Sequence, residues 1–445
     1  MTSTRRGFLS RAALAGGALV LPTGLLSTVG GGLTGCSSSS TQRRRTDHYV
    51  VFYLMVGGWD VMLTTDPVDR KPGFFMPWDD DDNVDFGGVT LGPAMAPLRP
   101  FADRMGIMRG IHVDALNHPQ ARFRMVTGKF KPPGTVVTAP SVQTFIAQAR
   151  SSDYELPNLS SDQLRPATFR GSIADPRLEP VRVASMTHLR GLTSLRGGVG
   201  RYRRDVEEAL RAKDALTEAR WKTASSSSLA SDFRTFADLE RHLAQSDYSQ
   251  RLAGAESLTD KAKDAVGAVD RIGNQVKLAV EAIRLALAPD DTDGTGEFDA
   301  HSRSEYATHP NAVKKGMRAV AAIAQGLQDV VLDDGRTLLD MTTIVVTSEF
   351  SRAPSKNELG GKHHWPTNSM IFLGKGVASG HDGAPRVFGV TDENLVAQPI
   401  NPRNGSTTDG ADVLDMSHGL ATILAIAGVD PHQAIGQEPI LDLLA

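Results

Sequence analysis

The chain contains a single cysteine in 445 residues, and this scarcity excludes two kinds of structure. Cys36 has no partner within the chain, so no intrachain disulfide can form and no metal site can use several thiolates. The formal net charge is −3, so no basic surface is expected and the sequence disfavours nucleic acid as a partner. Carboxylates and imidazoles remain as the candidate metal ligands.

The common short catalytic motifs are also missing. The sequence has no G-x-S-x-G elbow, no phosphate-binding P-loop and no H-E-x-x-H zinc motif. Thr127, Ser348 and Ser351 offer hydroxyl groups, but none has a base at a diagnostic spacing. The acidic run at 79–82 lacks EF-hand spacing and is typical of a solvated loop.

Long hydrophobic runs are absent as well. The apolar stretch at 12–26 is too short and too interrupted by glycine and proline for a comfortable membrane span. It follows Arg5 and Arg6, and the combination predicts a twin-arginine export signal.

The export signal ends at a sequence that resembles a lipobox, Leu33-Thr34-Gly35-Cys36. We therefore predict a signal peptide over residues 1–36, lipidation of Cys36 and a flexible tether over 37–46. The expected location is the periplasm or the cell surface, with the protein attached to the membrane through the lipid. The alternative is a plain cleaved signal in which Cys36 falls by chance.

Strand and helix patterns alternate along the rest of the chain. The runs at 49–55, 342–347 and 369–373 have the composition of buried strands. This alternation predicts an α/β domain over 47–445 with a doubly wound, mostly parallel sheet. Charged residues, alanine and leucine recur at helical spacing over 202–288, which predicts a helical insertion.

Acids and histidines stand where these strands end or where helices begin. Ligands collect at the carboxyl ends of the strands in open α/β sheets, so these residues are candidate metal ligands. Asp299 and His301 are two residues apart, and in extended chain their side chains point to the same side. The full set of candidates is Asp60, His118, Asp299, His301, Glu349, His364 and His418.

Each candidate also has a simpler interpretation as a capping or hydrogen-bonding residue. Pro119 fits the first position of a helix, which places His118 at the N-terminus of that helix. A helix N-terminus attracts anions. Ser417 is expected to cap the helix that carries His418 in its first turn. His363 and His364 point to different sides in extended chain, so at most one of them is expected to bind directly.

Four sequence pieces together resemble the DUF1501 family, which is similar to the alkaline phosphatase and sulfatase superfamily. In chain order the pieces are Gly57-Gly58-Trp59-Asp60, Asn117-His118 with Thr127-Gly128, Phe298-Asp299-Ala300-His301, and Ser348-Glu349-Phe350-Ser351-Arg352 with Gly361-Lys362-His363-His364-Trp365-Pro366. The resemblance covers roughly residues 47–445 and implies an alkaline phosphatase-like fold with two metal ions, commonly zinc. It implies Asp60 and Glu349 as ligands of one metal, and Asp299, His301 and His364 as ligands of the other.

One departure from the superfamily pattern concerns the nucleophile. The resemblance puts His118 where sulfatases carry a hydroxyl or thiol, so His118 is a metal ligand, an anion-binding group or itself the catalytic nucleophile. Two functional hypotheses follow. The first is an exported hydrolase of phosphate or sulfate esters, small or glycan-borne, with zinc, manganese or calcium. The second is a non-catalytic, lipid-anchored binding protein on the same fold; a structural lipoprotein is a minor third reading.

Overall fold

The computed structural model places the five strands of its central sheet in the order β1-β7-β10-β4-β11. Their bounds in that order are Tyr49–Leu54, Thr342–Thr347, Thr367–Gly374, Met105–His112 and Arg386–Phe388. The structure describes residues 48–69, 71–79, 82–130, 139–150, 158–160, 178, 181–182, 298–329, 331–332, 334–407 and 411–445. The predicted signal peptide, Cys36, the tether and the helical insertion at 202–288 lie outside these residues.

The sheet is mixed rather than uniformly parallel. β1 pairs with β7 and β4 pairs with β11 in parallel, whereas β10 lies antiparallel to both β7 and β4. Four strands therefore share one direction and β10 runs against them. The reason is the connection from β7 to β10, which carries only the β8–β9 hairpin (Ser351–Arg352 and His364–Trp365). A parallel return would need a crossover that travels back along the face of the sheet, usually through a helix.

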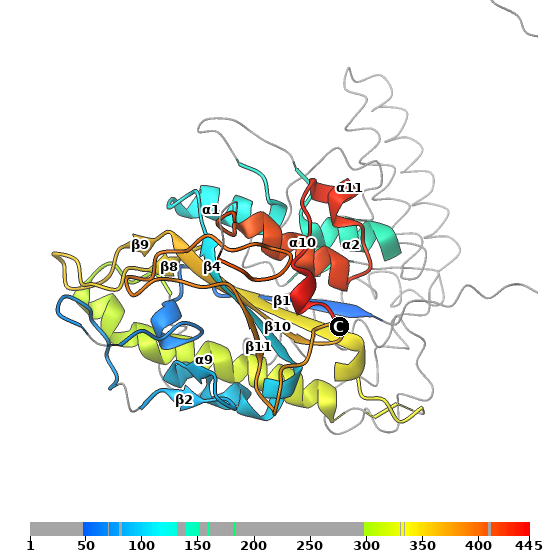
Figure 1. The fold of residues 1–445 in the computed structure, drawn as a ribbon, viewed down its shortest axis with the longest axis horizontal. Helices are drawn as coiled ribbons and strands as arrows, with labels where there is room; N and C mark the ends of the chain where they lie inside the picture. Colours follow the sequence, from blue (N-terminus) through cyan, green and yellow to red (C-terminus); the bar gives the residue numbers. More distant parts are fainter. Residues whose placement is uncertain are drawn as a thin grey trace, which may run out of the picture. The chain divides into compact units, whose positions relative to one another are not determined.

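Helices cover both faces of the sheet (Figure 1). On one face α9 (Arg303–Gln328) packs against the 3-10 segment η3 (Pro93–Arg104). On the other face lie α1 (His118–Thr127), α2 (Val142–Arg150), α10 (Met416–Ile426) and α11 (Pro431–Ile435). The prediction of an α/β domain with helices on both sides of its sheet is thus confirmed. Within the described residues, no helix combines the length and the apolar character needed to cross a bilayer.

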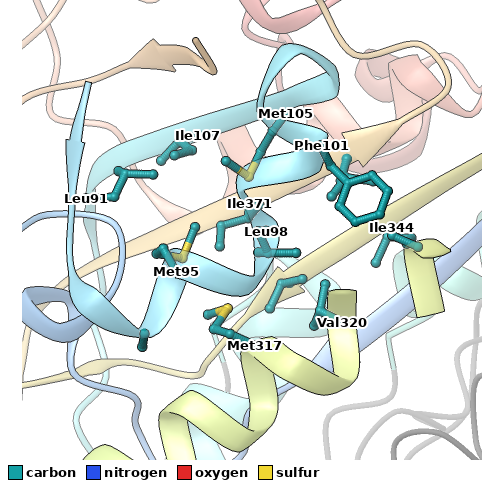
Figure 2. Close-up of a cluster of buried hydrophobic side chains, with 14 of the residues drawn as sticks. Leu91, Met95, Leu98, Phe101, Met105, Ile107, Met317, Val320, Ile344 and Ile371 are labelled. Carbon is teal, nitrogen blue, oxygen red and sulfur yellow. The ribbon is translucent and has the colours of Figure 1, made fainter. Parts of the chain in front are cut away.

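Side chains of the central strands alternate between two hydrophobic cores. In β7, Ile344 and Val346 enter the core beneath α9, and Val345 enters the core beneath α10. This follows from the period of two along a strand. Figure 2 shows the first core, where Ile344 and Ile371 meet side chains of η3 and α9. Full burial of each such aliphatic side chain contributes about 1.5–3 kcal/mol, which anchors the strand ends that carry the polar residues.

The remaining elements are short. They are β2 (Val84–Asp85), β3 (Thr90–Leu91), β5 (Leu159–Ser160), β6 (Val181–Arg182), η1 (Val61–Leu63), η7 (Leu339–Met341) and η8 (Leu441–Leu443).

The N-terminus of α10 differs from the prediction. Asp415, not Ser417, caps the helix, and it accepts hydrogen bonds from the backbone N–H groups of Ser417 and His418. The side chain of His418 completes a capping box with Asp415. A carboxylate two residues earlier outcompetes the serine because its charge also favours the positive helix end.

His309 is a fully buried histidine in α9. Its ring stacks on Tyr306 with the centroids 5.3 Å apart and meets Phe298 edge-on at 6.4 Å. Burial lowers the pKa of His309 to about 3. The folded protein therefore keeps this imidazole neutral at moderately acidic pH.

Replacing His309 by leucine should flatten the loss of stability in acid. An unfolded histidine titrates near pH 6.5, so between about pH 6.5 and 3 the unfolded chain holds one more proton here than the folded chain. Stability is therefore lost as the pH falls through this window. Between pH ~7.5 and ~5 the wild-type free energy of unfolding should fall by about 2 kcal/mol more than that of His309→Leu. Urea unfolding at both pH values measures this, with the exposed His432→Leu as control, and equal pH slopes in wild type and His309→Leu would contradict the assignment.

Candidate metal centre

The turn after β1 and the loop after β7 hold each other in place. The hydroxyl of Ser348 accepts hydrogen bonds from the backbone N–H groups of Gly58 and Trp59 and donates to the carbonyl of Met55. Both carboxylate oxygens of Glu349 accept from the N–H of Gly57, at 3.0 and 2.9 Å. The two most conspicuous sequence motifs are therefore partners, because parallel neighbours β1 and β7 end at the same edge of the sheet.

Arg352 is completely buried and holds the same segments together. Its guanidinium donates to the side chain of Asp299 at 2.7 Å. It also donates to the backbone carbonyls of Gly57, Gly58, Phe298 and Lys362. The planar fork directs its three nitrogens to acceptors on several sides, which a lysine could not do. One side chain thus joins three segments that are distant in sequence.

Gly57 and Gly58 permit the close approach of these segments. Their φ angles are +124° and +91°, a region that residues with a side chain rarely adopt. A Cβ atom at Gly57 would lie 2.6 Å from the backbone nitrogen of Asp299, and one at Gly58 would lie 2.6 Å from the ring of Phe350. The glycine pair therefore brings the 298–301 segment against the end of β1.

Four of the predicted ligands converge at this edge. One ligand atom from each of them lies within 4.8 Å of those of all the others; they are His118, Asp299, His301 and His364. His118 begins α1, Asp299 and His301 precede α9, and His364 begins β9. Three separate loops thus contribute one partly buried cluster, which could bind a metal ion.

Protein acceptors orient two of the imidazoles. His118 donates from Nδ1 to Glu349 at 2.8 Å, and His364 donates from Nδ1 to the carbonyl of Leu116 at 2.5 Å. Because Nδ1 of each ring is held in this way, Nε2 is the atom that faces the other cluster members and can bind a cation. His364 Nε2 lies 2.7 Å from His301 Nε2, and His118 Nε2 lies 3.2 Å from Asp299 Oδ2.

His118 Nε2 provides the test of whether the cluster suits a cation. The atom is buried and has no hydrogen-bond partner, although it lies beside Asp299. Buried polar atoms are normally paired, and an unpaired one needs an explanation. The three imidazoles and one carboxylate gathered around this atom are a donor set that a divalent cation accepts, so the residues fit a metal.

The charges around the cluster keep its groups in the ligand form. Burial opposes ionisation of Asp299, but the hydrogen bond and charge of Arg352 outweigh it and hold the pKa of Asp299 below its usual value. Burial, together with the charge of Arg352, lowers the pKa of His301 and brings the pKa of His364 to about 4. Metal ligands must be deprotonated, so these shifts favour cation binding at neutral pH.

Phe350 and the 357–362 loop support the cluster. The Phe350 ring stacks on His364 with the centroids 4.0 Å apart. The side-chain amide of Asn357 donates to the carbonyl of His301. Gly361 fits closely against His301, since a Cβ atom there would lie 2.4 Å from that carbonyl oxygen. These contacts restrict the position of the two most exposed imidazoles.

The structure does not bring Asp60, Glu349 or His418 into the cluster. Asp60 is fully buried and accepts from Lys362 Nζ at 2.7 Å and from the Tyr306 hydroxyl at 2.8 Å. Glu349 contacts His118 at Nδ1, the ring nitrogen that does not face the cluster. Burial raises the pKa of Glu349, but the hydrogen bonds from His118 and from the N–H of Gly57 outweigh it and keep that pKa below its usual value. His418 pairs with Asp415 at the start of α10.

Several residues of the site were not predicted from the sequence. Arg122 donates from Nε to Glu349 at 3.1 Å, and its spacing of four from His118 on α1 is a signal that could have identified it. Lys362 and Tyr306 carry no such signal, because each meets Asp60 only through the tertiary fold.

The solved structures that the chain resembles include two that are described as a putative sulfatase and a sulfatase. One is a protein of Bacteroides thetaiotaomicron VPI-5482 described as a "putative sulfatase", with 10% identity, a TM-score of 0.36 and coverage of 88% of this chain and 75% of that chain. The other is a 2-O GAG sulfatase, with 10% identity, a TM-score of 0.32 and coverage of 88% and 74%. No curated protein matches the sequence.

A family model described as "Protein of unknown function (DUF1501)" matches residues 201–433, more than half of the chain. The match includes Asp299, His301, the 348–352 motif and His364, whereas the Gly57–Asp60 and Asn117–Gly128 pieces precede it. The chain belongs to the DUF1501 family.

Proposed function

We propose that this protein is a metal-dependent hydrolase of phosphate or sulfate esters. One observation carries the proposal: three imidazoles and one carboxylate from separate loops converge, and the buried Nε2 of His118 has no hydrogen-bond partner among them. The opposite nitrogens of His118 and His364 are held by Glu349 and by the carbonyl of Leu116. Such outer partners orient metal-binding histidines and make them better ligands.

The donor set favours zinc. Zinc accepts nitrogen and carboxylate ligands together, whereas calcium takes oxygen ligands almost exclusively. Manganese is the second choice and calcium is disfavoured. A divalent cation held by these four residues supplies Lewis-acid chemistry, in which it polarises an ester oxygen and lowers the pKa of water.

The chain's own residues would bind and orient the substrate. The side chains of Asp299 and His301 are 41% and 37% exposed, so the cluster is open to solvent on this side. Arg122 is held against the same Glu349 oxygen that holds His118, and its side chain is 30% exposed. Its guanidinium can therefore stabilise the charge of an anionic ester beside the cluster. The cluster and its orienting groups contain no hydroxyl or thiol, so water is the nucleophile we propose, with His118 as a ligand.

The proposal also includes the detailed fold, the export route and the lipid anchor. An alkaline phosphatase-like fold is consistent with strands that end at a shared polar edge. Export by the twin-arginine pathway and lipidation at Cys36 rest on Arg5, Arg6 and the lipobox-like sequence. A protein on the outer side of the membrane would meet small esters or sulfated and phosphorylated glycans.

The test is hydrolysis of chromogenic phosphate and sulfate esters, and of a 2-O-sulfated disaccharide, by the purified full chain. We expect turnover with zinc, loss of turnover after chelation, and recovery when zinc is restored. His363→Ala is the matched control, because His363 neighbours His364 but is exposed and pairs with Glu358. Metal binding without turnover of any ester would support the non-catalytic binding protein, and absence of both would remove the hydrolase.

A further inference from the structure

Asp60 is a predicted metal ligand, but in the structure it forms an ion pair with the ammonium group of Lys362. Its Oδ2 accepts from Lys362 Nζ at 2.7 Å and from the Tyr306 hydroxyl at 2.8 Å, and its Oδ1 accepts from the backbone N–H of Met62 at 3.1 Å. Asp60 and Lys362 are both fully buried. A buried carboxylate needs such compensation, and here an ammonium group provides it.

Lys362 is held in this position from several directions. Its backbone N–H donates to the carbonyl of Ala300, and its own carbonyl accepts from Arg352. Its ammonium lies 5.0 Å from the centroid of the Tyr306 ring. The lysine therefore lies within the core beneath the cluster.

Glu349, the other carboxylate predicted for a second metal, is also engaged by donors of the protein. Its Oε1 accepts from His118, Arg122 and the N–H of Gly57. Its Oε2 shares the same N–H and lies 3.2 Å from the hydroxyl oxygen of Ser348, whose proton is donated to the carbonyl of Met55. Three donors therefore engage the carboxylate, chiefly at Oε1, and the side chain is fully buried.

The balance of charge also limits the number of cations. Three carboxylates (Asp60, Asp299 and Glu349) stand against three basic side chains (Arg122, Arg352 and Lys362) in this set of contacts. One divalent cation gives the site an excess of positive charge that suits an anionic ester. A second cation would have to enter a buried region that already holds Lys362, where like charges repel strongly.

We propose that the centre binds one divalent cation, and that the ammonium of Lys362 supplies to Asp60 the charge a second cation would otherwise supply. The inference rests on the proposed function, since it assumes that the four-residue cluster binds metal. It departs from the two-metal site that the superfamily resemblance implies.

The experiment is zinc titration of the metal-free full chain by isothermal calorimetry, with the bound metal counted by mass spectrometry. We expect one equivalent in the wild type and one in Asp60→Asn, with dissociation constants within about threefold of each other. We expect His364→Ala to bind zinc at least about a hundredfold more weakly. Two equivalents in the wild type, falling to one in Asp60→Asn, would overturn the inference and leave the proposed function standing. No bound metal in the wild type would overturn both.

A double-mutant cycle on the pair tests the role of Lys362 separately. Asp60→Asn and Lys362→Met should each lower the Tm, and the double variant should recover most of the loss, because neither buried charge then lacks its partner. All folded variants should keep one equivalent of zinc. Additive losses of Tm in the double variant would show that Asp60 and Lys362 do not compensate each other, and would overturn the assignment. The wild-type titration decides the stoichiometry even if a single variant fails to fold.

Discussion

Replacing His364 by alanine should lower the affinity of the protein for zinc by at least about a hundredfold, because one of four ligands is lost. Zinc sites with four ligands bind with about 10–16 kcal/mol, so one ligand accounts for about 3 kcal/mol, and each 1.4 kcal/mol is a factor of ten. His364 also supports His301, whose Nε2 lies 2.7 Å away, and it stacks on Phe350. Competition with a fluorescent chelator measures the affinity, and ester hydrolysis should fall with it.

The neighbouring histidine makes the test specific. His363→Ala changes the same loop, but the His363 side chain is 58% exposed and belongs to no described ligand group. We expect its zinc affinity to stay within about threefold of the wild type. If His364→Ala keeps full affinity while both variants fold normally, the cluster does not bind the metal.

Replacing Arg352 by methionine should lower the free energy of unfolding by about 3–5 kcal/mol, the range found when one partner of a buried charged network is removed. Methionine keeps much of the volume, so the loss comes from the hydrogen bonds. Without the guanidinium, the buried carbonyls of Gly57, Gly58 and Lys362 lose a donor. Arg352→Lys should recover only part of the loss, because one ammonium cannot reach the same set of acceptors.

Urea unfolding of the metal-free protein measures this effect without a contribution from metal binding. Arg336→Met is the control, because Arg336 is half-exposed and pairs with Asp334 within one turn. Its unfolding curve should match that of the wild type. A loss in Arg352→Met no larger than that of the control would mean that the three segments hold together without the guanidinium.

Much of the fold could be predicted from the sequence. The runs at 49–55 and 342–347 are apolar or β-branched, and the structure has strands there. The reversal of β10 was not predicted, because composition says nothing about the direction in which a strand enters a sheet. Direction depends on the connection, and the loop between β7 and β10 holds a hairpin instead of a crossover helix.

The grouping of the candidate ligands could be predicted in part. Asp299 and His301 were expected on one side of an extended segment, and both enter the cluster with His364 and His118. Asp60, Glu349 and His418 could not be separated from them in advance. Like the four cluster members, each is an acid or an imidazole at the end of a strand or the start of a helix. They differ only in the side chains that folding places beside them.

The sequence by itself determined the strands β1, β7 and β10 and the acids and histidines near strand ends, because apolar periodicity and strand-end position are local properties. Only the tertiary structure decided which of those side chains stay free for a cation. Lys362 reaches Asp60 across 302 residues of sequence, and Arg122 reaches Glu349 across 227. The availability of a buried carboxylate depends on the charges that folding places beside it, and those partners come from distant parts of the chain.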